Sequence, residues 1–204
     1  MLLKRREIQN TLADRRAEIV SGELLVFFED ESHLVWGDTQ GYGWGRRNER
    51  TPVLIENQRQ RQTYYGALNL YSQEFILRPS ARGNGSCTVE FIKYLQGLYP
   101  HQKLMIIWDG ARYHSGKKMQ AYLNHVNQGL EEKDWIVTCI LLAPYAPEQN
   151  PVEDVWLRGK NFLRRHFYEG GSFYKVKSQF FNFINKRVFN FGKCGWYTNI
   201  PQST

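Results

Sequence analysis

Three carboxylates in this chain stand at positions where a shared metal site can form. Asp30 and Asp109 each follow an apolar run typical of a buried strand, and Glu153 lies just inside a predicted helix. Acids brought together from strand ends and a helix start suit Mg²⁺, which prefers carboxylate and water ligands. Two such ions can activate a water molecule and stabilise a leaving 3′ oxygen, which is the chemistry of phosphodiester cleavage.

Each acid also has a purely structural interpretation. Asp30 can cap a turn, and its neighbours Glu29 and Glu31 are alternative ligands, because strand alternation selects one of them only when the register is known. Asp109 suits an ordinary turn after a strand. Glu153 occupies the position of a capping-box glutamate. The residues alone leave these alternatives open.

The segments around the acids carry a more specific signal. They span residues 27–32, 107–114 and 143–153, and the third reads Pro-Tyr-x-Pro-Glu-x-Asn-Pro-x-Glu. Together they resemble the three catalytic blocks of the IS630/Tc1-mariner transposases, which are DDE enzymes with a ribonuclease H-like catalytic domain. The resemblance covers roughly residues 23–168, and its third block is the most specific.

The resemblance implies a transposase catalytic domain that cleaves DNA at transposon ends and transfers the strands into target DNA. Asp30, Asp109 and Glu153 would be the catalytic residues and would hold two Mg²⁺ ions, with Mn²⁺ as a substitute. His114 is a secondary candidate for contacting the scissile phosphate or orienting water, although a lone histidine in a loop is often structural. The alternatives are a stand-alone ribonuclease H-like nuclease and a non-catalytic DNA-binding remnant of a transposase.

The same resemblance implies partners and a location. Transposon-end and target DNA are the expected substrates, and synapsis of two ends favours a homodimer. Only about twenty residues precede the first predicted strand, too few for a helix-turn-helix module, so a separate end-recognition polypeptide is a further expected partner. The family implies a bacterial cytoplasmic protein associated with the nucleoid.

Two features depart from the family pattern. Gly110 follows Asp109 where the family usually has asparagine, which removes a side-chain amide beside the expected metal site. Between Asp109 and Glu153 lie 43 residues, more than the family's usual spacing. The polar stretch 127–134 is interpreted as an insertion in a surface loop, where the site is undisturbed.

The predicted elements give a mixed α/β fold, a ribonuclease H-like sheet flanked by helices. Predicted strands cover 24–28, 33–36 (as the hairpin partner of the first), 64–70, 74–77, 104–108 and 135–142. Predicted helices cover 4–19, 88–98, 117–127 and a segment in which Asn150 is the N-cap, Pro151 the first residue and Glu153 the third. We divide the chain into an N-terminal helix (1–22), the catalytic domain (23–168) and a basic, aromatic C-terminal helical extension (169–204).

Charge and composition agree with a nucleic-acid-binding globular protein. The net charge is +7, and residues 155–204 carry nine Lys and Arg side chains against one acid, Glu169. Such a segment suits a polyanion, or is a solvated helical face. No apolar run approaches the ~20 residues of a membrane helix, so no membrane partner is expected. The three scattered cysteines indicate free thiols.

Basic side chains near the catalytic blocks and in the following helix are the candidates for contacting DNA. They are Arg46, Arg47, Arg112, Lys117, Arg158, Lys160, Arg164 and Arg165. In the segment 173–191, the side chains of Phe173, Phe180, Ile184 and Phe191 can share one face. We interpret them as core rather than as a base-stacking platform, and assign the lysines of this segment to the DNA backbone.

Overall fold

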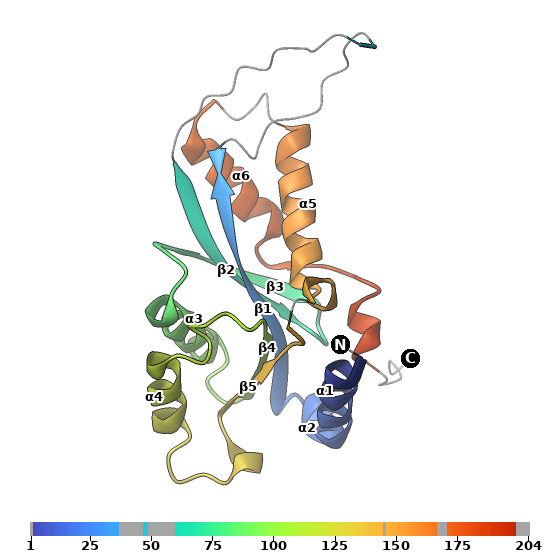
Figure 1. Ribbon diagram of the computed structural model, residues 1–204, viewed down its shortest axis with the longest axis vertical. Coiled ribbons are helices and arrows are strands. Elements are labelled where there is room, and N and C mark those ends of the chain that lie inside the picture. Colours follow the sequence, from blue (N-terminus) through green and yellow to red (C-terminus); the bar gives the residue numbers. More distant parts are fainter. Residues whose placement is uncertain (1, 37–46, 49–59, 145, 167–170, 199–204) are drawn as a thin grey trace.

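The computed structural model describes residues 2–36, 47–48, 60–144, 146–166 and 171–198, and it has one six-stranded mixed sheet (Figure 1). The strands are β1 (Leu24–Val35), β2 (Arg61–Asn69), β3 (Glu74–Ser80), β4 (Lys103–Trp108), β5 (Val137–Leu141) and β6 (Arg187–Val188). Their order across the sheet is β5-β4-β1-β2-β3-β6. β1, β4 and β5 are parallel, whereas β1, β2, β3 and β6 pair antiparallel.

Helices cover both faces of this sheet. They are α1 (Leu2–Asp14), α2 (Arg16–Ser21), α3 (Gly85–Leu98), α4 (Lys117–Val126), α5 (Val152–Arg165) and α6 (Phe173–Ile184). Alternate residues of β1 point to opposite faces. Phe28 packs in the cluster that includes α5 and α6 residues, whereas Phe27 packs in the cluster with α3 and α4 residues. The predicted mixed α/β class is therefore confirmed.

The first strand is longer than the sequence predicted. A hairpin between 24–28 and 33–36 was expected, but β1 runs without a turn from Leu24 to Val35. That prediction was wrong because the polar residues 29–32 resemble turn residues. They stay in the strand because β2 pairs with it along its whole polar half, from Glu29 opposite Ala67 to Val35 opposite Arg61. Asp30 therefore lies in the middle of a strand rather than at its end.

The other central elements match their predictions to within a few residues, as expected for element boundaries. This holds for β2, β3, β4, β5, α3 and α4. The N-terminal helix, predicted as one piece at 4–19, is two helices, and Gly22 ends the second in the left-handed conformation with φ of 76°. The thiols of Cys87, Cys139 and Cys194 are free.

The start of α5 differs by one residue from its prediction. The helix begins at Val152, yet the Asn150 side chain acts as expected, because its Oδ1 accepts a hydrogen bond from the Val152 amide at 3.1 Å. Its Nδ2 donates to the Glu29 carbonyl at 2.9 Å. Asn150 thereby joins the helix that carries Glu153 to the strand that carries Asp30.

The C-terminal segment packs against the same core. Phe173, Phe180, Ile184 and Phe191 are all buried, which confirms their assignment to packing. Gly159 lets α6 approach α5 closely, because a Cβ at this position would lie 2.6 Å from the Phe180 ring. The helix ends at Ile184, and the short strand β6, which the sequence did not predict, pairs with β3. The division into three segments stays a prediction.

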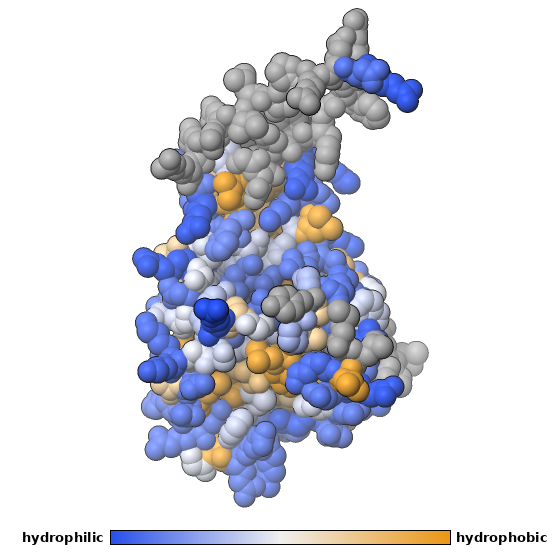
Figure 2. Space-filling view, in the orientation of Figure 1, coloured by the Kyte–Doolittle hydropathy of each residue, from blue (hydrophilic) through white to orange (hydrophobic). Residues whose placement is uncertain are grey.

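Figure 2 shows hydrophilic residues over most of one face of the molecule. Within the described ranges, no helix is long and apolar enough to cross a bilayer.

Candidate active site

The three predicted acids lie around one open cleft. The cleft has a volume of about 460 Å³, and Asp30, Asp109 and Glu153 all line it. The other lining residues are Gly110, Ala111, Leu142, Ala143, Pro144, Ala146, Pro147 and Asn150. Neither Lys nor Arg is among these residues, so the carboxylates face one another across largely apolar walls.

Asp30 is the most deeply placed of the three acids. It lies on the β1 face that packs against α5, and its Oδ2 accepts a hydrogen bond from Trp156 Nε1 at 2.9 Å. Burial and the nearby charge of Glu153 raise the pKa of Asp30 to about 8, although the Trp156 hydrogen bond opposes this shift. A carboxylate destabilised in this way is suited to binding a cation.

Asp109 follows the last residue of β4 and is held in place through one oxygen. Its Oδ1 accepts hydrogen bonds from the Ala111 amide at 2.9 Å and from His114 Nδ1 at 3.1 Å. The hydrogen bond from His114 is the main reason why the pKa of Asp109 is lowered. Both contacts engage Oδ1, which leaves Oδ2 for a ligand in the cleft.

Glu153 extends from the first turn of α5, and its side chain is exposed. Partial desolvation of the carboxyl group raises the pKa of Glu153. The positive charges of Lys160 and Lys193 oppose this shift, and the negative charge of Asp109 adds to it. Position 160 is seven residues further along the helix, so Lys160 lies on the same face as Glu153. The helix dipole also favours an acid in this first turn.

The register of β1 separates the adjacent acids that the sequence could not distinguish. Asp30 faces the cleft, whereas Glu29 and Glu31 lie on the opposite face of the strand, with the side chains of α3 and α4. His114 lies on that second face too, with 4% of its surface exposed and its ring stacked on Trp108 at 4.3 Å. It is not among the described residues that line the cleft, and it contacts the cleft acid Asp109 through Nδ1.

The candidate DNA-binding side chains fall into three groups. Arg46 lies outside the described residues, and Arg47, Arg112 and Lys117 are exposed in or beside loops. Lys160 and Arg164 follow Glu153 along one face of α5. Arg158 and Arg165 are exposed on another side of this helix, and Arg158 stacks over the ring of Phe191 at 4.6 Å.

Two residues near the cleft were missed by the sequence analysis. Trp156 was not singled out, although a buried indole N–H usually requires a hydrogen-bond acceptor, here Asp30. Gly66 lies directly opposite Asp30 on β2, and a Cβ there would come within 2.5 Å of the Trp156 ring. The missing side chain makes room for the indole that contacts Asp30.

We expect Asp30→Asn to stabilise the metal-free protein at alkaline pH. The pKa of Asp30 is about 8 in the folded protein, but about 3.9 in an unfolded chain. The folded state therefore retains a proton that the unfolded state releases, so wild-type stability falls as the pH rises from about 4 to about 8, by at most about 1.4 kcal/mol per unit. Urea unfolding in EDTA at pH 5 and pH 9 measures this effect. If the free energy of unfolding of Asp30→Asn falls with pH as steeply as that of wild type, this expectation is wrong.

Comparison with known proteins identifies the family and the fold. Residues 25–171 match the family model described as DDE superfamily endonuclease. No curated protein matches the chain. Among solved structures, the chain is similar to the Mos1 transposase paired-end complex with the left transposon end, with 14% identity and a TM-score of 0.58 over 95% of this chain and 56% of that chain.

Two further structures share the fold. The first is the catalytic domain of Mos1 mariner transposase, with 10% identity and a TM-score of 0.52 over 95% of this chain and 83% of that chain. The second is a simian T-cell lymphotropic virus intasome in complex with PP2A regulatory subunit B56 gamma. It has 9% identity and a TM-score of 0.53 over 88% of this chain and 56% of that chain. The predicted ribonuclease H-like fold is therefore confirmed. The chain spans about half of the Mos1 transposase chain in the paired-end complex.

Proposed function

Since this chain belongs to the DDE superfamily of endonucleases, we propose that it is the catalytic domain of a transposase. It cleaves DNA at the ends of a transposable element and joins the 3′ ends to target DNA. The observation that carries this proposal is the convergence of Asp30, Asp109 and Glu153, from three separate elements, on one cleft. The Mos1 transposase complexes, which share the fold, support the same activity.

The acids that line the cleft are of the kind that holds divalent metal ions. They supply oxygen ligands, which Mg²⁺ and Mn²⁺ prefer. Repulsion from Glu153 contributes to the raised pKa of Asp30, and neither Lys nor Arg is among the described residues that line the cleft. Asp30, Asp109 and Glu153 would hold the two ions. Bound there, such ions activate the attacking water and stabilise the leaving 3′ oxygen.

The chain's own residues position these carboxylates. Trp156 fixes the orientation of Asp30, while Ala111 and His114 fix Asp109. Asn150 fixes the start of α5 against β1 and so sets the distance of Glu153 from Asp30. Rigid placement of this kind lowers the cost of aligning the reacting groups. His114 acts here as a positioning residue rather than through contact with the phosphate.

DNA would follow the basic face of α5. Lys160 and Arg164 extend from Glu153 along that face and can neutralise phosphates on either side of the scissile bond. Arg47, Arg112, Lys117, Arg158 and Arg165 are exposed and would contact the backbone further away. Two copies of the chain, together with a separate end-recognition polypeptide, would assemble on paired transposon ends.

A strand-joining assay tests the proposed function. The chain is incubated in Mg²⁺ or Mn²⁺ with a short labelled duplex that has a free 3′-OH, and with supercoiled plasmid as target. We expect the label to become covalently joined to the plasmid only when divalent metal is present. A duplex whose 3′ end is a dideoxynucleotide is the matched control, because it binds alike but cannot attack.

The other possible results separate the alternative functions. Nicking of the plasmid without joining identifies a nuclease that only hydrolyses DNA. Salt-dependent DNA binding with neither product identifies a non-catalytic remnant. Either result contradicts the proposed strand transfer.

A further inference from the structure

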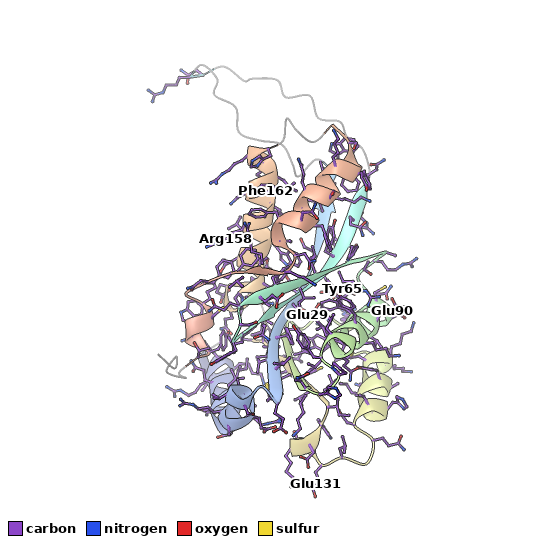
Figure 3. All side chains as sticks on the ribbon, turned by 180° about the vertical axis from the view of Figure 1, so that it is seen from behind. Glu29, Tyr65, Glu90, Glu131, Arg158 and Phe162 are labelled. Carbon is purple, nitrogen blue, oxygen red and sulfur yellow. The ribbon has the colours of Figure 1, made fainter. Side chains whose placement is uncertain are left out.

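A buried cluster lies on the face of β1 opposite the cleft. Glu29 and Glu31 point to this face, and His114 reaches it from the loop between β4 and α4. One ligand atom from each residue can be chosen so that all three lie within 4.8 Å of one another. Figure 3 shows Glu29 in the middle of the sheet, close to Tyr65. Since Asp30 points the other way, this cluster is distinct from the cleft.

Glu29 lacks the hydrogen bonds that a buried carboxyl group requires. The residue is 0% exposed, and neither carboxylate oxygen has a hydrogen-bond partner within the described part of the chain. Its Oε2 faces His114 Nε2 at 3.8 Å, which is too long for a hydrogen bond. A buried carboxyl group without a partner is costly whether it is ionised or neutral, so a group that fills this gap would stabilise the fold.

His114 is oriented as metal-binding histidines usually are. Its Nδ1 contacts the Asp109 carbonyl and Asp109 Oδ1, both at 3.1 Å, so that nitrogen is the donor. The second nitrogen, Nε2, points towards Glu31 Oε1 at 3.4 Å and Glu29 Oε2 at 3.8 Å. A carboxylate that holds Nδ1–H and leaves Nε2 for a metal is the common arrangement around zinc.

The spacing of these atoms suits a small tetrahedral ion. Ligands about 2.1 Å from Zn²⁺ lie roughly 3.4 Å from one another, close to the two separations at His114. One imidazole and two carboxylates favour Zn²⁺ over Mg²⁺, which keeps several water molecules and fits poorly in a site where Glu29 and His114 are both buried.

We propose that Glu29, Glu31 and His114 bind one structural divalent ion of the Zn²⁺ class. The ion connects β1 to the loop after β4, and it fixes, through His114, the carboxylate of Asp109 on the other side of the sheet. Without an ion, the carboxyl groups of Glu29 and Glu31 would lie close together on the buried face of β1. This site does not depend on the proposed function, because it serves the fold whether or not the cleft is catalytic.

Metal content and spectra test the proposal in the intact chain. Asp30→Asn/Glu153→Gln removes two acids from the cleft and leaves the cluster complete. We expect one equivalent of Zn²⁺ to remain bound to this variant after dialysis, and one equivalent of Co²⁺ to give the visible absorption of a tetrahedral site. Glu31→Gln, made in wild type or in the Asp30→Asn/Glu153→Gln variant, should abolish the binding of this Zn²⁺ equivalent and the visible absorption of Co²⁺.

A second variant keeps the test informative if Glu31→Gln fails to fold. Glu29→Leu removes the unpaired carboxyl group, so the metal-free variant should melt at least as high as metal-free wild type. It should lose the rise in Tm that Zn²⁺ gives wild type. Absence of Zn²⁺ binding in wild type and in the cleft variant would overturn the proposal. A protonated His114 ring would then supply the positive charge that faces Glu29 and Glu31. Binding that survives both Glu29→Leu and Glu31→Gln would overturn it as well.

Discussion

Asp109→Asn and Glu153→Gln are each expected to abolish metal-dependent DNA cleavage, a fall in rate of about a thousandfold or more. Each variant removes one carboxylate from the cleft, and the stabilisation that a bound metal gives to phosphoryl transfer is several kcal/mol. That energy corresponds to roughly three orders of magnitude in rate. Single-turnover cleavage of a labelled duplex in Mg²⁺ measures the loss.

Both changes keep the surrounding structure. Asn at position 109 can still accept hydrogen bonds from Ala111 and His114 through its amide oxygen. Glu148→Gln is the matched control, because Glu148 is exposed, lies a few residues before Glu153 and does not line the cleft. Cleavage at the wild-type rate in either cleft variant would rule out the assignment of these acids.

Gly66→Ala is expected to destabilise the fold and to weaken cleavage together. A Cβ at position 66 would lie 2.3 Å from the Phe75 ring and 2.5 Å from the Trp156 ring, and both belong to the packed core. Overpacking of this kind typically costs about 1–3 kcal/mol. Displacement of Trp156 also frees Asp30, and a misplacement of about 1 Å can lower the rate about 100-fold.

Urea unfolding and the cleavage rate of the folded variant give the two measurements. Gly97→Ala is the control, because a Cβ at that position in α3 meets nothing within 4 Å. It should leave cleavage unchanged and keep or raise stability, since alanine is favoured over glycine in a helix. If Gly66→Ala retains wild-type stability and activity, the close packing of Trp156 over β2 does not position Asp30.

Much of the fold could be predicted because its central elements have simple patterns. β4 is a continuous apolar run, as expected for a strand covered on both faces. In α3, Val89, Ile92, Leu95 and Leu98 repeat at helical spacing, and the two central positions, Ile92 and Leu95, are fully buried. The polar half of β1 could not be predicted in this way, because the pairing that keeps residues 29–35 extended comes from β2.

The candidate site shows the same limit. The three acids were found from local blocks, and Asp30 was chosen over Glu29 and Glu31 on the resemblance alone, because the residues do not give the register of β1. The cluster around Glu29 had no local signal, since His114 lies 83 residues beyond Glu31 in the chain. β6 was missed because two residues have no periodicity, and only pairing with β3 defines them.

The alternation of side chains along β1 has a consequence for how this strand can change over generations. Replacing Asp30 or Glu29 alters one face of the sheet and leaves the other intact. Insertion or deletion of a single residue before Glu29 exchanges the faces, so that Asp30 enters the buried pocket and its neighbours enter the cleft. Descendants of this chain should therefore differ in residue identity along β1 far more readily than in its length between Leu24 and Glu31.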